Sequence, residues 1–216
     1  MNKKNEYLIL TNKQTNKKLV YYPVAKNANS SVKLFLIKHL NLEDQFYFEE
    51  DTIPLHKQNQ NSSNDINNKY NLVNFIPSYT KFKKIEADDK ACIFREPLNR
   101  FISSYRNRIL FHKDEEFHNH SIDQILEKLE NNIFENKHFL PQTYWLGEDL
   151  NYFTIKADIK NLKPFVAGIN NFFDKNIEFP QIQTGGKEFK IKLKLDQKNK
   201  IKKIYSSDYD LVNNFM

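Results

Sequence analysis

The chain has 216 residues, of which 39% are hydrophobic and 14% aromatic, so it is long and apolar enough for one domain with a buried core and is not a disordered chain. Its single cysteine, Cys92, excludes an internal disulfide and a cysteine-based metal site, and four glycines are too few for a Gly-rich phosphate loop. The net charge of +6 fits either a lysine-rich surface or a bound polyanion, such as nucleic acid, an anionic glycan or a nucleotide.

The sequence gives no sign of a targeting or membrane segment. It contains no run of 18 or more apolar residues, which is the length needed to span a bilayer. Residues 1–6 are polar and charged, and the four apolar residues that follow are too few for the hydrophobic region of a signal peptide. We therefore expect a cytoplasmic protein without integral membrane contact.

The first half of the chain predicts a hairpin, a helix, a long loop and a strand, in that order. Residues 7–11 and 19–22 are rich in β-forming side chains and are separated by a polar stretch, which is typical of a hairpin. Residues 30–40 carry apolar side chains at helical spacing, whereas residues 57–70 carry almost none and indicate a loop. Residues 91–94 are apolar between charged flanks and predict a strand.

The second half predicts one strand and four helices, the first of which begins at Pro97. Proline suits the first helical position because its missing N–H would have no partner there. The buried face of this helix is expected to consist of Leu98, Phe101, Ile102, Tyr105 and Ile109. The other expected elements are helices at residues 121–131, 162–173 and 198–213 and a strand at residues 152–155. Strands that alternate with helices indicate a single α/β domain with a parallel sheet.

One segment that can carry chemistry is residues 22–31, which join the second strand to the first helix. Backbone N–H groups at the start of this helix point into the turn with the helix dipole behind them, and such a helix start binds anions. Lys26 is close enough in sequence to bring its ammonium to the same anion, and Ser30 and Ser31 can cap the helix and donate a hydroxyl. The alternative interpretation is an ordinary serine cap beside a surface lysine.

A second such segment, residues 93–105, joins a strand to the helix that begins at Pro97. Arg95 leaves the strand at the carboxyl edge of the sheet, where ligands gather in open α/β sheets. Arg100, Ser103 and Asn107 are expected on the polar side of the helix. Arg95 and Ser103 can then converge on one phosphate. The alternative is a solvated helix face with an ion pair between Arg95 and the neighbouring glutamate.

Taken in order, the two segments resemble the family of sulfotransferases that use 3'-phosphoadenosine-5'-phosphosulfate (PAPS). The first segment is similar to the family's 5'-phosphosulfate loop at Lys26, Ala28, Ser30 and Ser31. The second segment is similar to its 3'-phosphate motif at Arg95, Pro97, Arg100, Ser103 and Tyr105. The sequence also departs from the family: the proline often found directly before the loop lysine stands three residues earlier, at Pro23, and residues 156–158 read Lys-Ala-Asp where the family frequently has a Glu.

Two later segments resemble the carbohydrate (Golgi-type) branch of this family and its bacterial relatives. Residues 138–142 match a His-x-x-Pro-Gln pattern of that branch, and residues 205–211 resemble its terminal helix. The resemblance implies one sulfotransferase domain over residues 1–216. It also implies a fold like that of P-loop NTPases, a three-layer sandwich with a small central parallel sheet flanked by helices.

The resemblance further implies that PAPS donates a sulfuryl group to a hydroxyl of a carbohydrate. The phosphosulfate loop, at about residues 22–32, would bind PAPS through Lys26, Asn27, Ala28, Asn29, Ser30 and Ser31. The 3'-phosphate motif, at about residues 93–105, would bind through Arg95 and Ser103, and Lys187 beside two glycines would close over the nucleotide. Lys26 would also neutralise the leaving phosphate, and because Lys and Arg supply the charge no metal is expected.

A general base must take the proton of the acceptor hydroxyl, and histidine suits neutral pH. His56 is favoured because it lies between the two phosphate motifs, where the family often places its base. His138 is the second candidate, with orientation of the acceptor as its other role. The carboxylates Glu49, Glu50 and Asp51 stay open. The remaining histidines are expected to be structural (His39) or solvated (His112, His118 and His120).

Other functions stay open on the sequence alone. A P-loop kinase or NTPase would have a related fold, but no Gly-x-x-x-x-Gly-Lys-Ser/Thr motif occurs. A basic nucleic-acid-binding protein would explain the charge, although our interpretation expects no nucleic-acid partner. A sulfotransferase that binds nucleotide without turnover is a third alternative. The acceptor is open as well, since lipids, small metabolites and peptide tyrosines also carry hydroxyls.

Overall fold

The computed structural model describes residues 8–12, 14–41, 70–74, 82–181 and 188–215. Two predicted site residues, His56 and Lys187, lie outside the described residues, as do the carboxylates at residues 49–51 and most of the predicted long loop.

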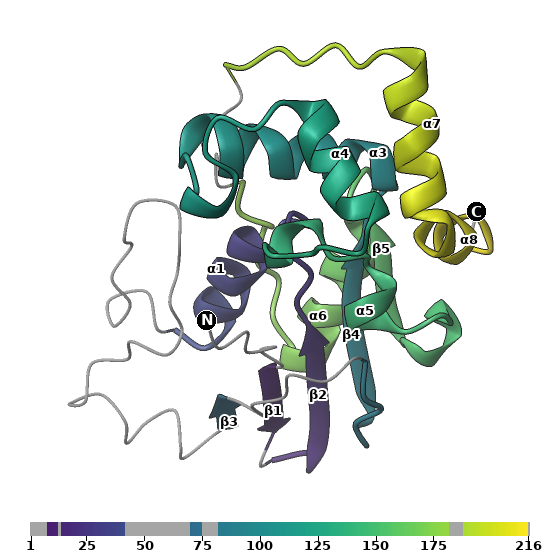
Figure 1. The fold of residues 1–216 in the computed structure, drawn as a ribbon. Coiled ribbons are helices and arrows are strands. Elements are labelled where there is room, and N and C mark those ends of the chain that lie inside the picture. Colours follow the sequence, from purple (N-terminus) through teal and green to yellow (C-terminus); the bar gives the residue numbers. More distant parts are fainter. Residues whose placement is uncertain (1–7, 13, 42–69, 75–81, 182–187, 216) are drawn as a thin grey trace.

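A mixed sheet of five strands forms the centre of the described part of the chain (Figure 1). In spatial order the strands are β3 (Tyr70–Asn74), β1 (Leu8–Asn12), β2 (Lys17–Tyr22), β4 (Asp89–Phe94) and β5 (Ile155–Asp158). β1 pairs antiparallel with β2 and with β3, whereas β2, β4 and β5 run parallel. The predicted hairpin is therefore confirmed. The parallel strands β2 and β4 end at the same edge of the sheet, and both predicted phosphate motifs begin there.

Both faces of the sheet are covered, which explains why the strands are apolar without a clear alternation. In β2, Leu19 and Tyr21 belong to the core on one face, and Val20 and Tyr22 belong to the core on the other. The first face is covered by α1 (Asn29–His39) and α6 (Lys163–Phe173), and the second by α5 (Thr143–Leu146) and α8 (Ser206–Asn213). This arrangement confirms the predicted α/β sandwich of three layers.

A third core lies above the carboxyl edge of the parallel strands (Figure 1). It joins three helices: α3 (Pro97–Ser104), α4 (Ile122–Glu130) and α7 (Leu195–Ile204). Phe101 from α3, Leu126 from α4 and Ile201 from α7 are all buried in it. The helix predicted from Pro97 and the one predicted at residues 121–131 are thereby confirmed, and Ser121 caps α4 through a bond from the Gln124 amide.

Two helices differ from their predicted course. α3 ends at Ser104 and continues as a π-helix over Tyr105–Phe111, in which the His112 amide bonds to the Asn107 carbonyl five residues earlier. The wider turn buries Asn107, so its predicted place on a polar face is wrong. The predicted helix over residues 198–213 is two helices, α7 and α8, which meet at Tyr205, where the buried ring hydroxyl donates to the Phe139 carbonyl.

The strands also differ from expectation in two places. β3 was not predicted at all, and the strand predicted at residues 152–155 is β5, which begins at Ile155. Tyr152 ends a short 3₁₀ turn instead, because its hydroxyl is held by the backbone of Ile85. Ile155 and Ala157 alternate into the core, and this alternation sets the register of the strand against β4.

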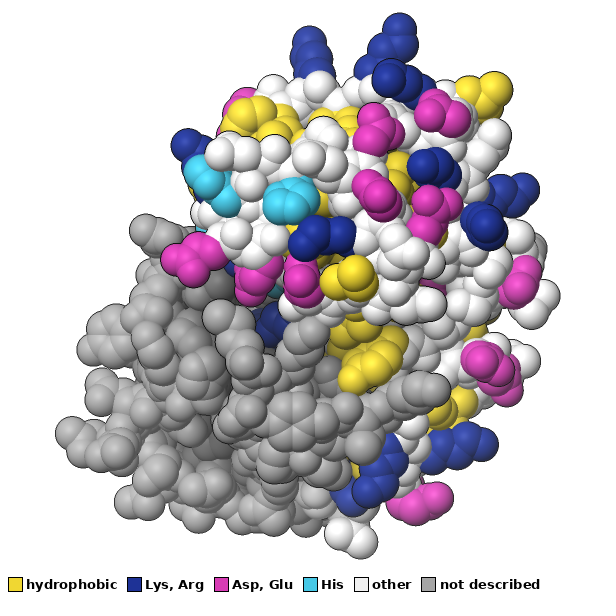
Figure 2. Space-filling model, in the orientation of Figure 1, with side chains coloured by type: hydrophobic (Ala, Val, Ile, Leu, Met, Phe, Trp, Pro, Cys, Tyr) yellow, Lys and Arg dark blue, Asp and Glu magenta, His cyan; other side chains and the backbone are white. Residues whose placement is uncertain are grey.

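The visible surface carries charges of both signs. Figure 2 shows Lys and Arg side chains along the edge formed by α7 and the segment before it, with Asp and Glu side chains between them and α4. Lys200 of α7 pairs with Glu130 of α4 at 3.5 Å. No helix within the described residues is long and apolar enough to cross a membrane.

Candidate active site

The loop of residues 23–28 connects β2 to α1 and has an unusual backbone. Lys26 has a φ of 67° and Ala28 a φ of 58°, so two non-glycine residues occupy the left-handed region. Each such residue costs on the order of 1–2 kcal/mol relative to a relaxed conformation. Consecutive turns of this kind point backbone N–H groups into one concavity, which suits an anion. The shape that glycines usually supply is therefore imposed on this loop by its surroundings.

Four hydrogen bonds hold the 23–28 loop from the outside. Arg95 Nη1 donates to the Lys26 carbonyl at 3.0 Å, and Arg100 Nε donates to the Ala25 carbonyl at 3.1 Å. The amide of Asn27 is fully buried and donates to the Ile93 carbonyl at 2.9 Å and to Gln142 Oε1 at 2.6 Å. The two predicted phosphate motifs are thus in direct contact, although about 70 residues separate them in the sequence.

The loop leads into the amino end of α1. Ala28 is the N-cap, no side chain caps the helix among the described residues, and the first turn contains no acidic residue. Ser30 and Ser31 lie inside the first turn, so the prediction that they cap the helix is wrong. Val32 is the first residue whose amide closes a helical bond, to the Ala28 carbonyl. The N–H groups ahead of it do not take part in the helical hydrogen-bond ladder of α1, and helix starts of this kind bind anions.

Arg95 stands at the carboxyl end of β4, as predicted. Burial, together with the charges of Arg100 and Arg106, lowers the pKa of its guanidinium, while Glu96 acts in the opposite direction. The Glu96 carboxylate accepts from the amides of Leu98 and Asn99 and caps α3, rather than taking up the Arg95 side chain. Positive charge is consequently in excess at this edge of the sheet.

Arg106 belongs to this cationic group, and sequence reasoning did not single it out. Its Nε atom is buried and has no hydrogen-bond partner in the described part of the protein. A buried donor close to another guanidinium group, that of Arg95, is stabilised by an anion. The sequence did contain a sign of this role. Arg106 follows Ser103 by three residues, and residues at this spacing lie on the same side of a helical segment.

Arg100 is 1% exposed, so its predicted place on the polar side of α3 is wrong. It points inward, lies 4.0 Å from the Asp208 carboxylate, and has its guanidinium over the Trp145 ring. Its Nη2 donates to the carbonyls of His138 and Leu140, at 3.3 and 2.6 Å. Because the same side chain also bonds to the 23–28 loop, it joins that loop to the segment around His138.

The terminal helix reaches the site through Asp208, which is completely buried. Its carboxylate accepts from the amides of Gln142 and Thr143, at 2.7 and 2.9 Å. Gln142 in turn exchanges two hydrogen bonds with the backbone of Arg95, at 2.9 and 2.7 Å. Residues 138–142 and the terminal helix, which the sequence suggested only by resemblance, are therefore the structural support of the 23–28 loop.

A protein-family model described as the sulfotransferase family matches residues 10–213. The chain belongs to the sulfotransferase family. The match covers both phosphate motifs and the terminal helix, so this sulfotransferase is an enzyme that transfers a sulfuryl group to an acceptor hydroxyl. The comparison with curated proteins and the comparison with solved structures give no match.

The described candidate residues of the sulfotransferase fall into three groups. Lys26 to Ser31 form the loop and helix start described above, and Arg95 contacts that loop. Ser103 lies half-buried in the last turn of α3, and within the described residues no hydrogen bond joins it to Arg95. His138 lies in a short 3₁₀ turn whose backbone is bonded to α3, since Ser104 Oγ donates to its carbonyl at 2.8 Å.

His39 has the structural role expected of it. It is completely buried, and its ring nitrogens contact the Phe35 carbonyl at 2.8 Å and Asn170 Oδ1 at 2.7 Å. His118 is exposed, as expected for a solvated residue, and His112 and His120 are partly buried.

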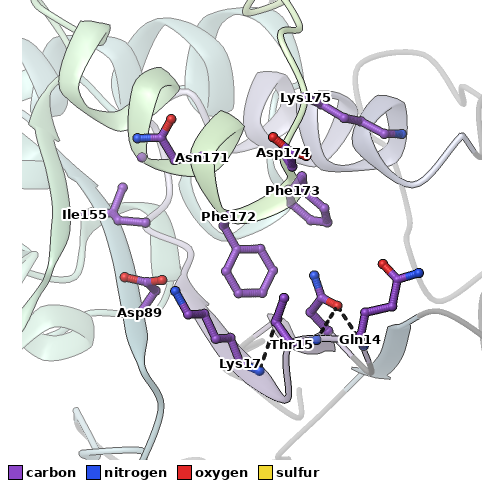
Figure 3. Close-up of a pocket in the computed structure, with 12 residues that line it drawn as sticks. Gln14, Thr15, Lys17, Asp89, Ile155, Asn171, Phe172, Phe173, Asp174 and Lys175 are labelled. Carbon is purple, nitrogen blue, oxygen red and sulfur yellow. Dashed lines mark hydrogen bonds between the residues drawn. The ribbon is translucent and has the colours of Figure 1, made fainter.

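A separate hollow of about 470 Å³ lies at the opposite end of the sulfotransferase sheet. Its lining includes Lys17 and Asp89, from the amino ends of β2 and β4, and Phe172 from α6. In Figure 3 the Phe172 ring points from α6 toward Lys17 and Thr15. Because the 23–28 loop and Arg95 follow the carboxyl ends of the same parallel strands, this hollow is not the candidate active site.

Proposed function

We propose that this sulfotransferase moves a sulfuryl group from PAPS to a hydroxyl of a carbohydrate acceptor. The observation that carries the proposal is the bond from the Arg95 guanidinium to the Lys26 carbonyl, which joins the two motifs at one sheet edge. PAPS has a 5'-phosphosulfate and a 3'-phosphate, and therefore needs two neighbouring cationic sites. Nucleotides without the 3'-phosphate need only one.

The 5'-phosphosulfate is assigned to the 23–28 loop and the start of α1. Ala28, Asn29, Ser30 and Ser31, at the end of the loop and in the first turn of α1, would surround it, while Asn27 holds the loop because its backbone amide donates to the Val24 carbonyl at 3.2 Å. The Lys26 ammonium would neutralise charge on the phosphate oxygen that departs from sulfur. Stabilisation of a leaving group by fixed donors of this kind is usually the largest contribution to catalysis of group transfer.

The 3'-phosphate is assigned to Arg95 and Ser103. The geometry further supports Arg106 as a third donor, because its buried Nε has no partner within the described residues. Lys187 stays a candidate contact to the nucleotide and lies outside the described part of the chain.

In the transfer itself the acceptor oxygen attacks sulfur in line with the departing oxygen. One S–O bond forms as the S–O bond to phosphate breaks, and the hydroxyl proton passes to a base. His56 and His138 are the candidate bases, and only His138 is among the described residues. The carbohydrate acceptor is supported by the resemblance of residues 138–142 and 205–211 to the carbohydrate branch.

Mass spectrometry of candidate glycans after incubation with PAPS tests the proposed function. We expect a mass gain of one SO₃ unit on a glycan together with formation of 3'-phosphoadenosine 5'-phosphate. If sulfated product forms only on lipids, small metabolites or tyrosine peptides, the carbohydrate part of the proposal is wrong. If no acceptor class is sulfated although PAPS binds, the chain binds nucleotide without turnover.

A further inference from the structure

His138 is held at three of its four polar atoms by described residues. Its amide donates to Asn136 Oδ1 at 3.0 Å, and its carbonyl accepts from Ser104 Oγ and from Arg100. Its ring atom Nδ1 lies 2.8 Å from the same Asn136 Oδ1. No hydrogen bond to Nε2 occurs within the described residues. The ring is therefore fixed in place, and Nε2 is the one atom left to react.

The proton on the imidazole can be located from the neighbours of Asn136. Asp114 accepts from Arg108 Nε at 2.7 Å and from Arg108 Nη2 at 2.5 Å, a two-point pairing that keeps the carboxylate ionised. An ionised carboxylate only accepts hydrogen bonds. The Asn136 atom 2.6 Å from Asp114 Oδ2 must then be the amide nitrogen, so the amide oxygen faces His138. That oxygen only accepts, and Nδ1 of His138 must carry the proton.

The charges around His138 keep the ring neutral. Burial lowers the pKa of His138 well below its ordinary value, and the positive charges of Arg108, Lys137, Lys26 and Arg100 lower it further. A neutral imidazole with its proton on Nδ1 has a lone pair on Nε2. Since Arg100 donates both to the Ala25 carbonyl and to the His138 carbonyl, His138 lies in the segment that is bonded to the 23–28 loop.

We propose that Arg108, Asp114 and Asn136 are positioning residues that fix the tautomer of His138, and that Nε2 of His138 takes the proton of the acceptor hydroxyl. The inference rests on the proposed function and deepens it. As the acceptor oxygen forms its bond to sulfur, its proton passes to Nε2 and the electron pair of the O–H bond stays on oxygen. The departing phosphate oxygen keeps the pair from the broken S–O bond, and the imidazolium later releases its proton to water.

The first test is the tautomer of His138, which can be measured without any turnover. Long-range ¹H–¹⁵N correlation spectra of the full chain at pH 7 report which nitrogen of each histidine is protonated, and the His138→Gln variant assigns the signal. We expect Nδ1 protonated and Nε2 unprotonated. Asp114→Asn removes the carboxylate that holds Asn136 Nδ2 and leaves only the His138 backbone amide to orient the Asn136 side chain, so part of the His138 signal should move toward the Nε2-protonated form. A wild-type His138 protonated on Nε2 overturns the proposal.

The second test measures steady-state kinetics with PAPS and an acceptor that the wild-type enzyme sulfates. It separates residues that position His138 from residues that bind PAPS. Asp114→Asn should lower kcat by roughly 10- to 100-fold, which is a part of the roughly 100- to 10,000-fold that a positioned general base contributes, with the KM for PAPS unchanged. The matched control is Glu116→Gln, which removes an exposed carboxylate of the neighbouring turn and should leave kcat unchanged. An unchanged kcat in Asp114→Asn overturns the proposal, as does a loss of the same size in Glu116→Gln.

Three further results complete the design. If Asp114→Asn does not fold, the wild-type tautomer and the kinetics of Asn136→Ala carry the same test. If kcat falls in His56→Ala but not in His138→Gln, His56 is the base and the present inference is wrong. If His138 has the expected tautomer but no acceptor is sulfated by any variant or by the wild type, the proposed function fails instead.

Discussion

Lys26 and Ala28 adopt left-handed backbone conformations in a loop whose relatives in phosphate-binding proteins commonly contain glycine. The chain has only four glycines and uses hydrogen bonds from Arg95, Arg100 and Asn27 to hold the strained shape. Strain that is balanced by neighbouring contacts is typical of functional sites. At the scale of the residue, the site is therefore preorganised by polar side chains rather than by small ones.

Lys26→Ala tests the leaving-group role. Because the ammonium would act mainly in the transition state, we expect kcat for sulfuryl transfer to fall by about 100- to 1000-fold with an unchanged melting temperature. Activity assays and thermal unfolding measure the two effects. The control is Lys38→Ala at the far end of α1, which should keep full activity, and full activity in Lys26→Ala itself would remove the loop from the mechanism.

Arg106→Gln tests the third donor to the 3'-phosphate. A hydrogen bond to a charged group contributes roughly 1.5–3 kcal/mol, so 3'-phosphoadenosine 5'-phosphate should bind about 10- to 100-fold more weakly. Adenosine 5'-phosphate lacks the 3'-phosphate and serves as the control ligand, with equal affinity for variant and wild type. Calorimetric titration distinguishes the two, and an equal loss for both nucleotides would contradict the assignment.

His138 makes stability depend on pH in a defined direction. Its pKa is lowered in the folded state, so below about pH 6.5 the unfolded chain binds a proton at this site that the folded chain does not. Acidification from pH 7 through that value, down to the lowered pKa, should therefore reduce the free energy of unfolding. In His138→Gln the urea midpoint should depend less on pH in this range, whereas the exposed-site variant His118→Gln should behave as wild type. Identical slopes in all three proteins would contradict this.

At the scale of the element, the spacing of apolar residues predicted helices and strands correctly wherever the burial of those residues decides the structure. The helices α1, α3, α4 and α6 and the β1–β2 hairpin were predicted from local features of the sequence, such as apolar spacing, β-forming runs and the proline at the start of α3. The displaced strand near Tyr152 and the break at Tyr205 were not, because tyrosine hydroxyls bonded to distant backbone groups decide both. Such long-range polar contacts leave no periodic signal in the sequence.

In the candidate site, too, features that follow from the local sequence were predicted, and features that depend on long-range polar contacts were not. Lys26 and Arg95 were predicted to bind two ends of the same nucleotide, and in the structure the segments that carry them are in contact. Arg100 was predicted to face outward because a charged side chain on a helix normally does, and only the carbonyls and the carboxylate that surround it explain its burial. Asn136 and Asp114 could not have been found in advance, since their role depends on a contact between separate loops.

Asp208→Asn tests whether the terminal helix supports the site. Removing one charge of a buried pair leaves Arg100 uncompensated, so we expect the free energy of unfolding to fall by about 3–5 kcal/mol. Asp210→Asn, at an exposed position of the same helix α8, is the matched control and should change it by no more than about 0.5 kcal/mol. Urea denaturation measures both, and equal stabilities of the two variants would show that the Arg100–Asp208 pair does not support the fold.

At the scale of the whole molecule, the candidate site is assembled from four separate segments at one end of the sheet. They are the 23–28 loop, Arg95 with α3 and the π-helix, residues 136–142, and the start of α8. The three layers of the sandwich fix the parallel strands, and the helical core above their carboxyl edge fixes Arg100 and His138. The arrangement places positive charge where a nucleotide with anionic groups at both its 3' and 5' positions would bind.

The central claim is that this edge binds PAPS. Calorimetric titration of the wild-type chain with 3'-phosphoadenosine 5'-phosphate, compared with ATP and Mg²⁺ under the same conditions, tests it most directly. Since the second phosphate adds at least one charged hydrogen bond, we expect 3'-phosphoadenosine 5'-phosphate to bind tighter by about tenfold or more. Tighter binding of ATP with Mg²⁺ would contradict the account and indicate a kinase-like nucleotide site.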